Sequence, residues 1–170
     1  MFKRLNWVVF VLLMVIGAAA LLPITGIYSN ASCEWTAQSP AVAADKLTPL
    51  PSLSLSLRTP DATLGVGLRE RLERGLKKGG VVELVDNPHT FPRAQITVTE
   101  MDGRWTPFWA RLKMKTNVVL DRKKDRKGTD VSVDVVVEGS CKGLVTRDEW
   151  QGSGLDTLAE HVIAQILPGT

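Results

Sequence analysis

The stretch that decides the fold runs from Ala94 to Thr146 and reads AQITVTEMDGRWTPFWARLKMKTNVVLDRKKDRKGTDVSVDVVVEGSCKGLVT. Apolar and polar residues alternate in three parts of it, which start at Ala94, Ala110 and Val131. A period of two is typical of a strand with one buried face. Asp102-Gly103 tolerates the positive φ angles of a tight hairpin turn. The stretch therefore predicts three antiparallel strands.

The flanking sequence adds two strands and two helices. Leu53 to Arg58 alternates like a strand, and Val81 to Val85 is a short apolar run. Between them, leucines recur every fourth residue from Leu64 to Leu76, which predicts a helix that ends at Gly79-Gly80. A second helix follows Gly152-Ser153-Gly154. We expect an α+β fold, with an antiparallel sheet of four to five strands and both helices packed on one face.

The N-terminus carries a membrane or export signal. Two cations precede an apolar run from Trp7 to Tyr28, which is long enough to form a transmembrane helix. Ser29-Asn30-Ala31 also resembles a signal cleavage site. We expect an anchor or signal over 1–31, a linker over 32–52 and a periplasmic domain over 53–168. The charges predict a single pass through the inner membrane with a cytoplasmic N-terminus. Cleavage predicts a secreted or outer-membrane-anchored domain instead.

The chain has two cysteines, Cys33 and Cys141. In an oxidising compartment they predict a disulfide between the juxtamembrane segment and the sheet. The alternatives are that both are free, or that Cys33 pairs or is lipidated separately. Neither belongs to a CxxC pair, and the two histidines lie far apart, so we expect no metal site.

Cations gather on one face of the second strand and in the tip that follows it. The set comprises Arg111, Lys113, Lys115, Arg122, Lys123, Lys124, Arg126 and Lys127. Clustered cations beside an apolar sheet predict binding of an anionic lipid. The alternative is a solvated face and a charged tip that prevents edge aggregation. Asp121, Asp125 and Asp130 partly neutralise the tip, which favours that alternative.

Three aromatic residues, Trp105, Phe108 and Trp109, crowd around Pro107 just after the expected turn. Aromatic residues dominate binding hot spots, so the cluster predicts a partner-docking patch. The alternative is that it caps the end of the core.

The sequence offers no catalytic constellation. His89 and His161 have no evident carboxylate or nucleophile beside them, and Gly65-Val66-Gly67 lies inside a helix, not in a phosphate-binding loop. A net charge of +3 is too small to indicate nucleic acid. We expect neither an enzyme nor a cofactor.

The element order, the N-terminal segment and the pattern L-x3-L-x3-L…VVELVDNP…RAQITVTEMDGRW resemble the small envelope lipoproteins of Gram-negative bacteria. The resemblance covers about residues 53–167. It is greatest to the lipopolysaccharide-assembly lipoprotein of the outer-membrane translocon, and auxiliary lipoproteins of lipid-transporting ABC systems look similar. These families carry an aliphatic residue three positions before the acylated cysteine. Asn30 stands there in this chain, which argues against lipidation of Cys33.

The resemblance implies a non-enzymatic accessory protein of envelope assembly, in lipopolysaccharide or phospholipid transport. Its expected partners are the membrane, a larger membrane protein complex and an anionic lipid. The alternative is a structural single-pass subunit of another inner-membrane complex, with no ligand of its own.

Overall fold

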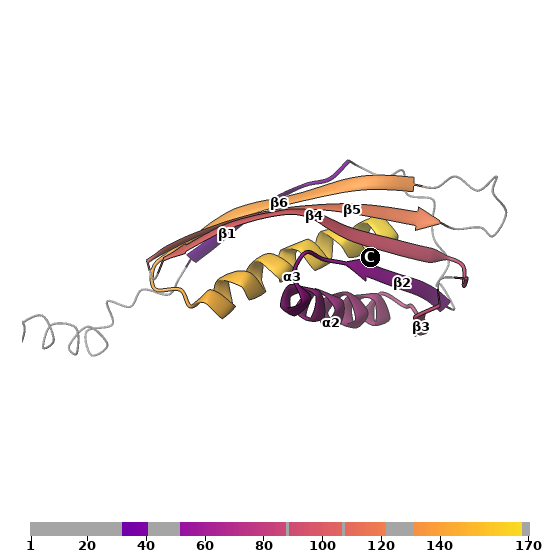
Figure 1. Ribbon diagram of the computed structural model, residues 1–170. Coiled ribbons are helices and arrows are strands. Elements are labelled where there is room, and N and C mark those ends of the chain that lie inside the picture. The colour runs from indigo at the N-terminus through magenta and orange to yellow at the C-terminus, as the bar shows by residue number, and fades with distance from the viewer. Residues whose placement is uncertain (1–31, 41–51, 88, 107, 122–130, 168–170) are drawn as a thin grey trace, which may run out of the picture.

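The structure, a computed structural model, describes residues 32–40, 52–87, 89–106, 108–121 and 131–167. Within these residues six strands form one sheet, and two helices lie on one side of it (Figure 1). The elements in chain order are β1 (Ser32–Gln38), β2 (Ser52–Arg58), α2 (Ala62–Lys78), β3 (Glu83–Val85), β4 (Arg93–Thr106), β5 (Trp109–Asp121), β6 (Val131–Lys142) and α3 (Arg147–Ile166). The α+β class and the two helices on one face are confirmed.

The sheet is larger than predicted and is mixed, with the strand order β1-β6-β5-β4-β2-β3. Strands β1, β6, β5 and β4 pair antiparallel, as expected for the long strands. Strand β2 is parallel to both β3 and β4, so the prediction of a purely antiparallel sheet is wrong. Parallel strands need a crossover connection, usually a helix, and α2 makes this connection between β2 and β3.

The hairpin between β4 and β5 turns later than predicted. Asp102-Gly103 lies inside β4, which continues to Thr106, where Thr106 pairs with Trp109. A register shift between Val98 and Glu100 interrupts the ladder, and pairing with β5 then continues through Asp102-Gly103 to Thr106.

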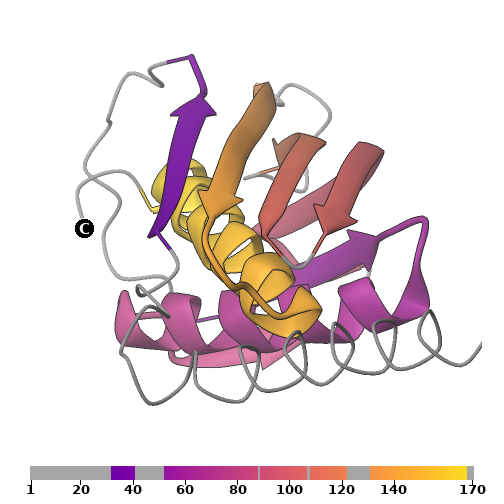
Figure 2. The same cartoon turned by 90° about the vertical axis from the view of Figure 1, so that its left-hand side faces the viewer.

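The core lies between the sheet and the helices. Helix α3 runs beneath β6, β5 and β1, and α2 packs beside it (Figure 2). Helix α2 matches the prediction in its leucine stripe, which is buried, and in its end at Gly79. Its N-cap is Asp61, whose side chain accepts a hydrogen bond from the Thr63 backbone N–H. The largest fully buried side chains include Leu53, Leu68, Leu72, Ile96, Leu112, Met114, Val135 and Leu158.

Helix α3 begins at Arg147, five residues before Gly152. Thr146 and Glu149 form a capping box, in which the Thr146 side chain accepts from the Glu149 N–H and the Glu149 carboxylate accepts from the Thr146 N–H. This cap satisfies two N–H groups that otherwise lack a partner inside the helix. Gly152 and Gly154 therefore lie within the helix.

The range predicted as a linker, 32–52, opens with a strand. Strand β1 adds to the sheet beside β6, and the disulfide between Cys33 and Cys141 joins the two strands, as predicted. The side chain of Trp35 reaches from β1 to α3, where its Nε1 donates to Ser153 Oγ at 2.8 Å. Strand β1 is thus part of the folded domain. Residues 41–51 lie outside the described residues.

Candidate docking surface

The three predicted docking residues lie together at one end of the sheet. Trp105, Phe108 and Trp109 flank the β4–β5 turn, and Leu144 in the β6–α3 loop is also exposed. We call these four residues the aromatic end. Phe108 is 71% exposed, Trp105 41%, Trp109 39% and Leu144 37%. Phe108 is mostly exposed, whereas the larger part of each of the other three side chains is covered.

Hydrogen bonds fix the aromatic end to its neighbours. The hydroxyl of Thr106 accepts from the Trp109 N–H at 3.1 Å and donates to the Trp109 carbonyl at 2.7 Å. The indole N–H of Trp105 donates to the Val145 carbonyl at 3.0 Å, and the Gly143 N–H donates to the Phe108 carbonyl at 3.2 Å. These bonds fix the hairpin to the β6–α3 loop. Trp105 and Trp109 lie on opposite faces of the hairpin, because Trp105 is the register partner of buried Ala110 and Trp109 that of Thr106.

The predicted basic row, Arg111, Lys113 and Lys115, lies on the face of β5 away from the helices. Acidic residues lie opposite it on both neighbouring strands, since Asp102 and Glu138 are the register partners of Lys113. The remaining predicted lipid-binding cations, Arg122, Lys123, Lys124, Arg126 and Lys127, lie outside the described residues.

Ion pairs match much of the charge of the basic row. Arg111 pairs with Glu138, and this hydrogen bond and charge lower the pKa of the Glu138 carboxyl. The Nζ of Lys115 lies 3.6 Å from Asp134. A hydrogen bond from Asn117 and the nearby Lys115 lower the pKa of Asp134. Both carboxylates are therefore charged at neutral pH, and the row is balanced by acids.

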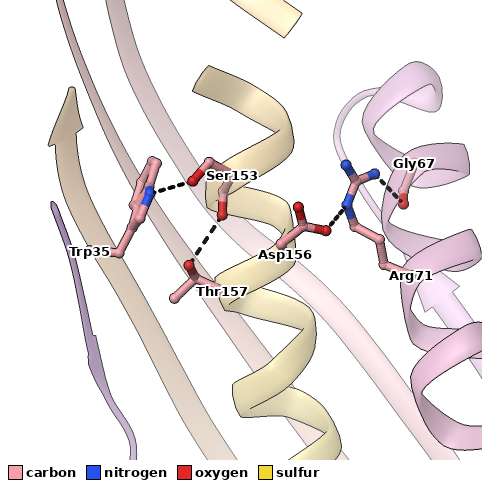
Figure 3. Close-up of polar contacts among 6 residues, drawn as sticks. All are labelled: Trp35, Gly67, Arg71, Ser153, Asp156 and Thr157. Carbon is pink, nitrogen blue, oxygen red and sulfur yellow. Dashed lines mark hydrogen bonds and ion pairs between the residues drawn. The ribbon is translucent and has the colours of Figure 1, made fainter. Parts of the chain in front are cut away.

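Two hollows lie near charged side chains. One, of about 350 Å³, lies on the open sheet face against Trp109, Arg111 and Glu138. The other, of about 420 Å³, lies between the N-terminal parts of α2 and α3 and is lined by Arg71. The Nε of Arg71 lies 2.5 Å from Asp156, and its Nη1 donates to the Gly67 carbonyl (Figure 3). Arg71 and Arg111 each have a carboxylate partner, and Arg147 also lines the hollow beside Arg71.

The two histidines do not converge on a reactive group. The Nδ1 of His161 donates to the Thr157 carbonyl at 2.9 Å, a bond within helix α3. His89 is exposed, and its backbone N–H bonds to the Asn87 side chain. Among the residues that the structure describes, no three His, Cys, Asp or Glu side chains gather in a way that could hold a metal ion.

The disulfide decides between the alternatives for Cys33. Its sulfur is bonded to that of Cys141, which is fully buried, 108 residues further along the chain. A sulfur in a disulfide has no thiol left to carry an acyl chain, so the bridged form of the domain is not lipidated at Cys33.

Sequence reasoning missed Trp35, which fastens β1 to α3. The indole is bonded to the Ser153 hydroxyl, and the Ser153 carbonyl accepts from the Thr157 hydroxyl one turn later at 3.1 Å (Figure 3). The signal was present: Cys33, Trp35 and Ala37 alternate with polar residues. That alternation indicates a strand with one buried face.

No family model matches this chain, and no curated protein matches it. Solved structures of similar fold include a minor lipoprotein from Acinetobacter baumannii (22% identity, 69% of this chain and 92% of that one, TM-score 0.44). The PelC dodecamer from Paraburkholderia phytofirmans is 15% identical over 79% of this chain and 95% of that one, with a TM-score of 0.44. Rare lipoprotein B from Shewanella oneidensis is 13% identical over 66% of this chain and 92% of that one, with a TM-score of 0.39.

The predicted localisation, a single pass through the inner membrane, is corrected. No helix among the described residues is long and apolar enough to cross a bilayer. The predicted transmembrane helix therefore has no support from the structure. The apolar run from Trp7 to Tyr28, on which that prediction was based, lies outside the described residues.

Proposed function

We propose that this protein is a non-enzymatic, exported accessory domain of the bacterial cell envelope. It acts by docking its aromatic end at a larger membrane-associated assembly. The observation that carries the proposal is the exposure of Trp105, Phe108 and Trp109 at one end of the sheet, on a hairpin that hydrogen bonds hold in place. Clustered aromatic side chains on a rigid support lose little conformational entropy on binding, which makes them effective contact residues.

The disulfide supports export. Disulfides persist in the periplasm and outside the cell, whereas the cytosol keeps thiols reduced. Cys33 and Cys141 are register partners on adjacent strands, so the bridge is part of the sheet itself. The positively charged start and the apolar run that follows are the sequence features of an exported chain.

A binding role without catalysis fits the polar groups of the described surface. Arg71 and Arg111 line the two hollows, and each is engaged by a carboxylate of this chain. The carboxyl of Glu138 has its pKa lowered, not raised towards neutrality as a general acid requires. These groups hold the fold together instead of offering a poised acid or base.

Co-purification from mild detergent tests the docking role. The Phe108→Ala/Trp109→Ala variant should lose most of the membrane proteins that accompany the wild-type chain, as counted by quantitative mass spectrometry. The matched control is Val66→Ala/Val82→Ala, which truncates two side chains that are 61% and 79% exposed elsewhere. Equal recovery of partners with both variants would contradict docking through the aromatic end.

A finer proposal is that the assembly transports lipopolysaccharide or phospholipid. It rests on Lys113, which has no ion pair within the described parts of the chain and lies on the sheet face without helices. Immobilised lipopolysaccharide should retain the wild-type protein better than Lys113→Glu/Lys115→Glu. The Lys113→Gln/Lys115→Gln variant controls for loss of the positive charges without added negative charges. Equal retention of the wild type and both variants would contradict the lipid role.

A further inference from the structure

The folded domain begins at its aromatic end. In the sheet register Ser32, the first residue of β1, is the partner of Lys142 on β6, and Lys142 is the partner of Trp109 on β5. In Figure 1 the start of β1 and the connection between β4 and β5 lie at the same end of the sheet. Three residues separate Ser32 from Tyr28, where the apolar N-terminal run ends. The chain therefore enters the domain beside its exposed aromatic side chains.

The side chains at this end have the chemistry of the bilayer interface. Tryptophan is enriched at the headgroup level of membranes, where its ring is buried and its polar edge stays wet. Trp105 and Trp109 are partly exposed, and Phe108 between them protrudes furthest. The indole N–H of Trp105 is already satisfied by the Val145 carbonyl. Insertion of that ring edge among lipids leaves no unpaired donor.

Cations surround the aromatic end. Arg104, Lys142 and Arg147 are exposed, and none forms an ion pair with another described residue. The acids near this end are Asp148, Glu149, Asp102 and Glu34, which lines the hollow beside Trp109, and the carboxylate of Glu149 is turned back onto Thr146. Cations and acids are mixed here, and the three cations are available to the phosphate groups of phospholipid headgroups.

The size of the surface also points to lipid. Given ordinary side-chain areas, the four residues of the aromatic end expose on the order of 400 Å² together. A standard protein interface takes about 800 Å² from each partner. The patch covers roughly half of that, whereas interfacial insertion needs only a few apolar side chains.

We propose that the aromatic end lies in the headgroup region of a phospholipid bilayer, so that lipid forms part of the surface on which this domain docks at its membrane-associated assembly. This inference rests on the proposed function and names the partner of the same site. The domain then stands on the membrane by the end at which its chain enters. The opposite end of the sheet, where β3 lies, points away from the lipid (Figure 1).

Tryptophan quenching in vesicles tests the inference. The full chain carrying Trp7→Phe is reconstituted into phosphatidylethanolamine–phosphatidylglycerol vesicles in which some lipids are brominated near the headgroup. Trp150 is buried and Trp35 is packed against α3, so accessible emission comes from Trp105 and Trp109. We expect bromolipid to quench that emission and the Phe108→Glu variant to lose most of the quenching. Val82→Glu, 79% exposed at the other end of the sheet, should keep it.

Photo-crosslinking in cells separates the two proposals. A benzoylphenylalanine at position 108 should capture phospholipid, and one at position 82 should not. Vesicles that give no quenching, or equal quenching with Phe108→Glu and Val82→Glu, overturn the bilayer contact. If position 108 then captures a protein, docking through the aromatic end stands and only the lipid partner is wrong. If position 108 captures neither, the proposed function is also wrong.

Discussion

Trp35 fills the space that two glycines leave between β1, β6 and α3. A Cβ added to Gly154 would lie 2.8 Å from Trp35 Cη2 and 2.7 Å from Leu112 Cδ2. A Cβ on Gly139 would collide with the same indole ring. Leu112 is fully buried, so it has little room to move. The glycines are therefore required by close approach, and the indole is the partner that requires them.

Substitution of Gly154 tests this packing. Gly154→Ala should lower the free energy of unfolding by about 1–3 kcal/mol, because overpacking outweighs the gain in helix propensity. Gly152→Ala in the same helix is the matched control. Its Cβ would meet only the flexible end of Arg71, at 3.3 Å, so propensity should raise stability by roughly 0.5–1 kcal/mol. Urea unfolding measures both, and a stabilising Gly154→Ala would show that α3 does not pack on Trp35 as described.

Glu149 makes the cap of α3 sensitive to acid. Hydrogen bonds from the backbone and the side chain of Thr146 lower the pKa of Glu149 below its ordinary 4.5. A carboxyl with a lowered folded pKa adds stability above its unfolded pKa and loses it as the pH falls through the folded value. Glu149→Gln keeps the capping geometry but cannot titrate.

Stability should consequently depend on pH differently in wild type and Glu149→Gln. The wild type should lose this contribution as the pH falls below the ordinary value of 4.5 and through the lowered pKa of Glu149. The difference in unfolding free energy between the two proteins should shrink over that range. Denaturant titrations at a series of pH values measure it, with Glu160→Gln, an exposed acid further along α3, as the control. A constant difference would mean that the Glu149 carboxylate is not held by the cap.

Helices and strands differ in how readily the sequence predicts them. Helix α2 follows from the leucine spacing and from Asp61, because its signals are local. The start of α3 was predictable as well, from Thr146-x-x-Glu149, but Gly152 and Gly154 suggested a later start. Those glycines serve packing, which only the tertiary structure shows.

The pairing of strands was less accessible. Strand β1 shows alternation, yet the proline-rich sequence after it favoured a linker. The parallel pairing of β2 with β4 leaves no local signal, because register depends on distant residues. The aromatic cluster was identifiable from the sequence. Its exposure was not, since an identical cluster can cap a core.

Strand β1 lies at the edge of the sheet and depends on the disulfide. In the chain-entropy model, cross-linking a loop of about one hundred residues stabilises a fold by up to roughly 4–5 kcal/mol. Reduction of the disulfide should therefore lower the free energy of unfolding by up to about 4–5 kcal/mol. Backbone amides of β1 should lose protection from hydrogen exchange before those of β5. The double variant Cys33→Ser/Cys141→Ser should not respond to reductant, and a wild type that ignores reductant would contradict a structural role for the bridge.

At the scale of the whole molecule, the two faces and the two ends of the sheet have different roles. The inner face is covered by helices, and the outer face carries acids opposite bases, as in Asp102–Lys113–Glu138. The exposed aromatic side chains Trp105, Phe108 and Trp109 are concentrated at one end. That end is also where Ser32 begins the fold. The chain therefore enters the domain at the end that carries the exposed aromatic side chains.

The state of the cysteines in cells tests the compartment in which this molecule works. If the domain is exported, neither Cys33 nor Cys141 should react with an alkylating reagent before reduction, and both should react afterwards, because the oxidising compartment closes the bridge. When export is blocked, both should react at once. The intact mass of the chain should show no acyl group on Cys33, since one sulfur cannot form both bonds. Free thiols in untreated cells would contradict export, and an acylated Cys33 would show that β1 is not bridged to β6.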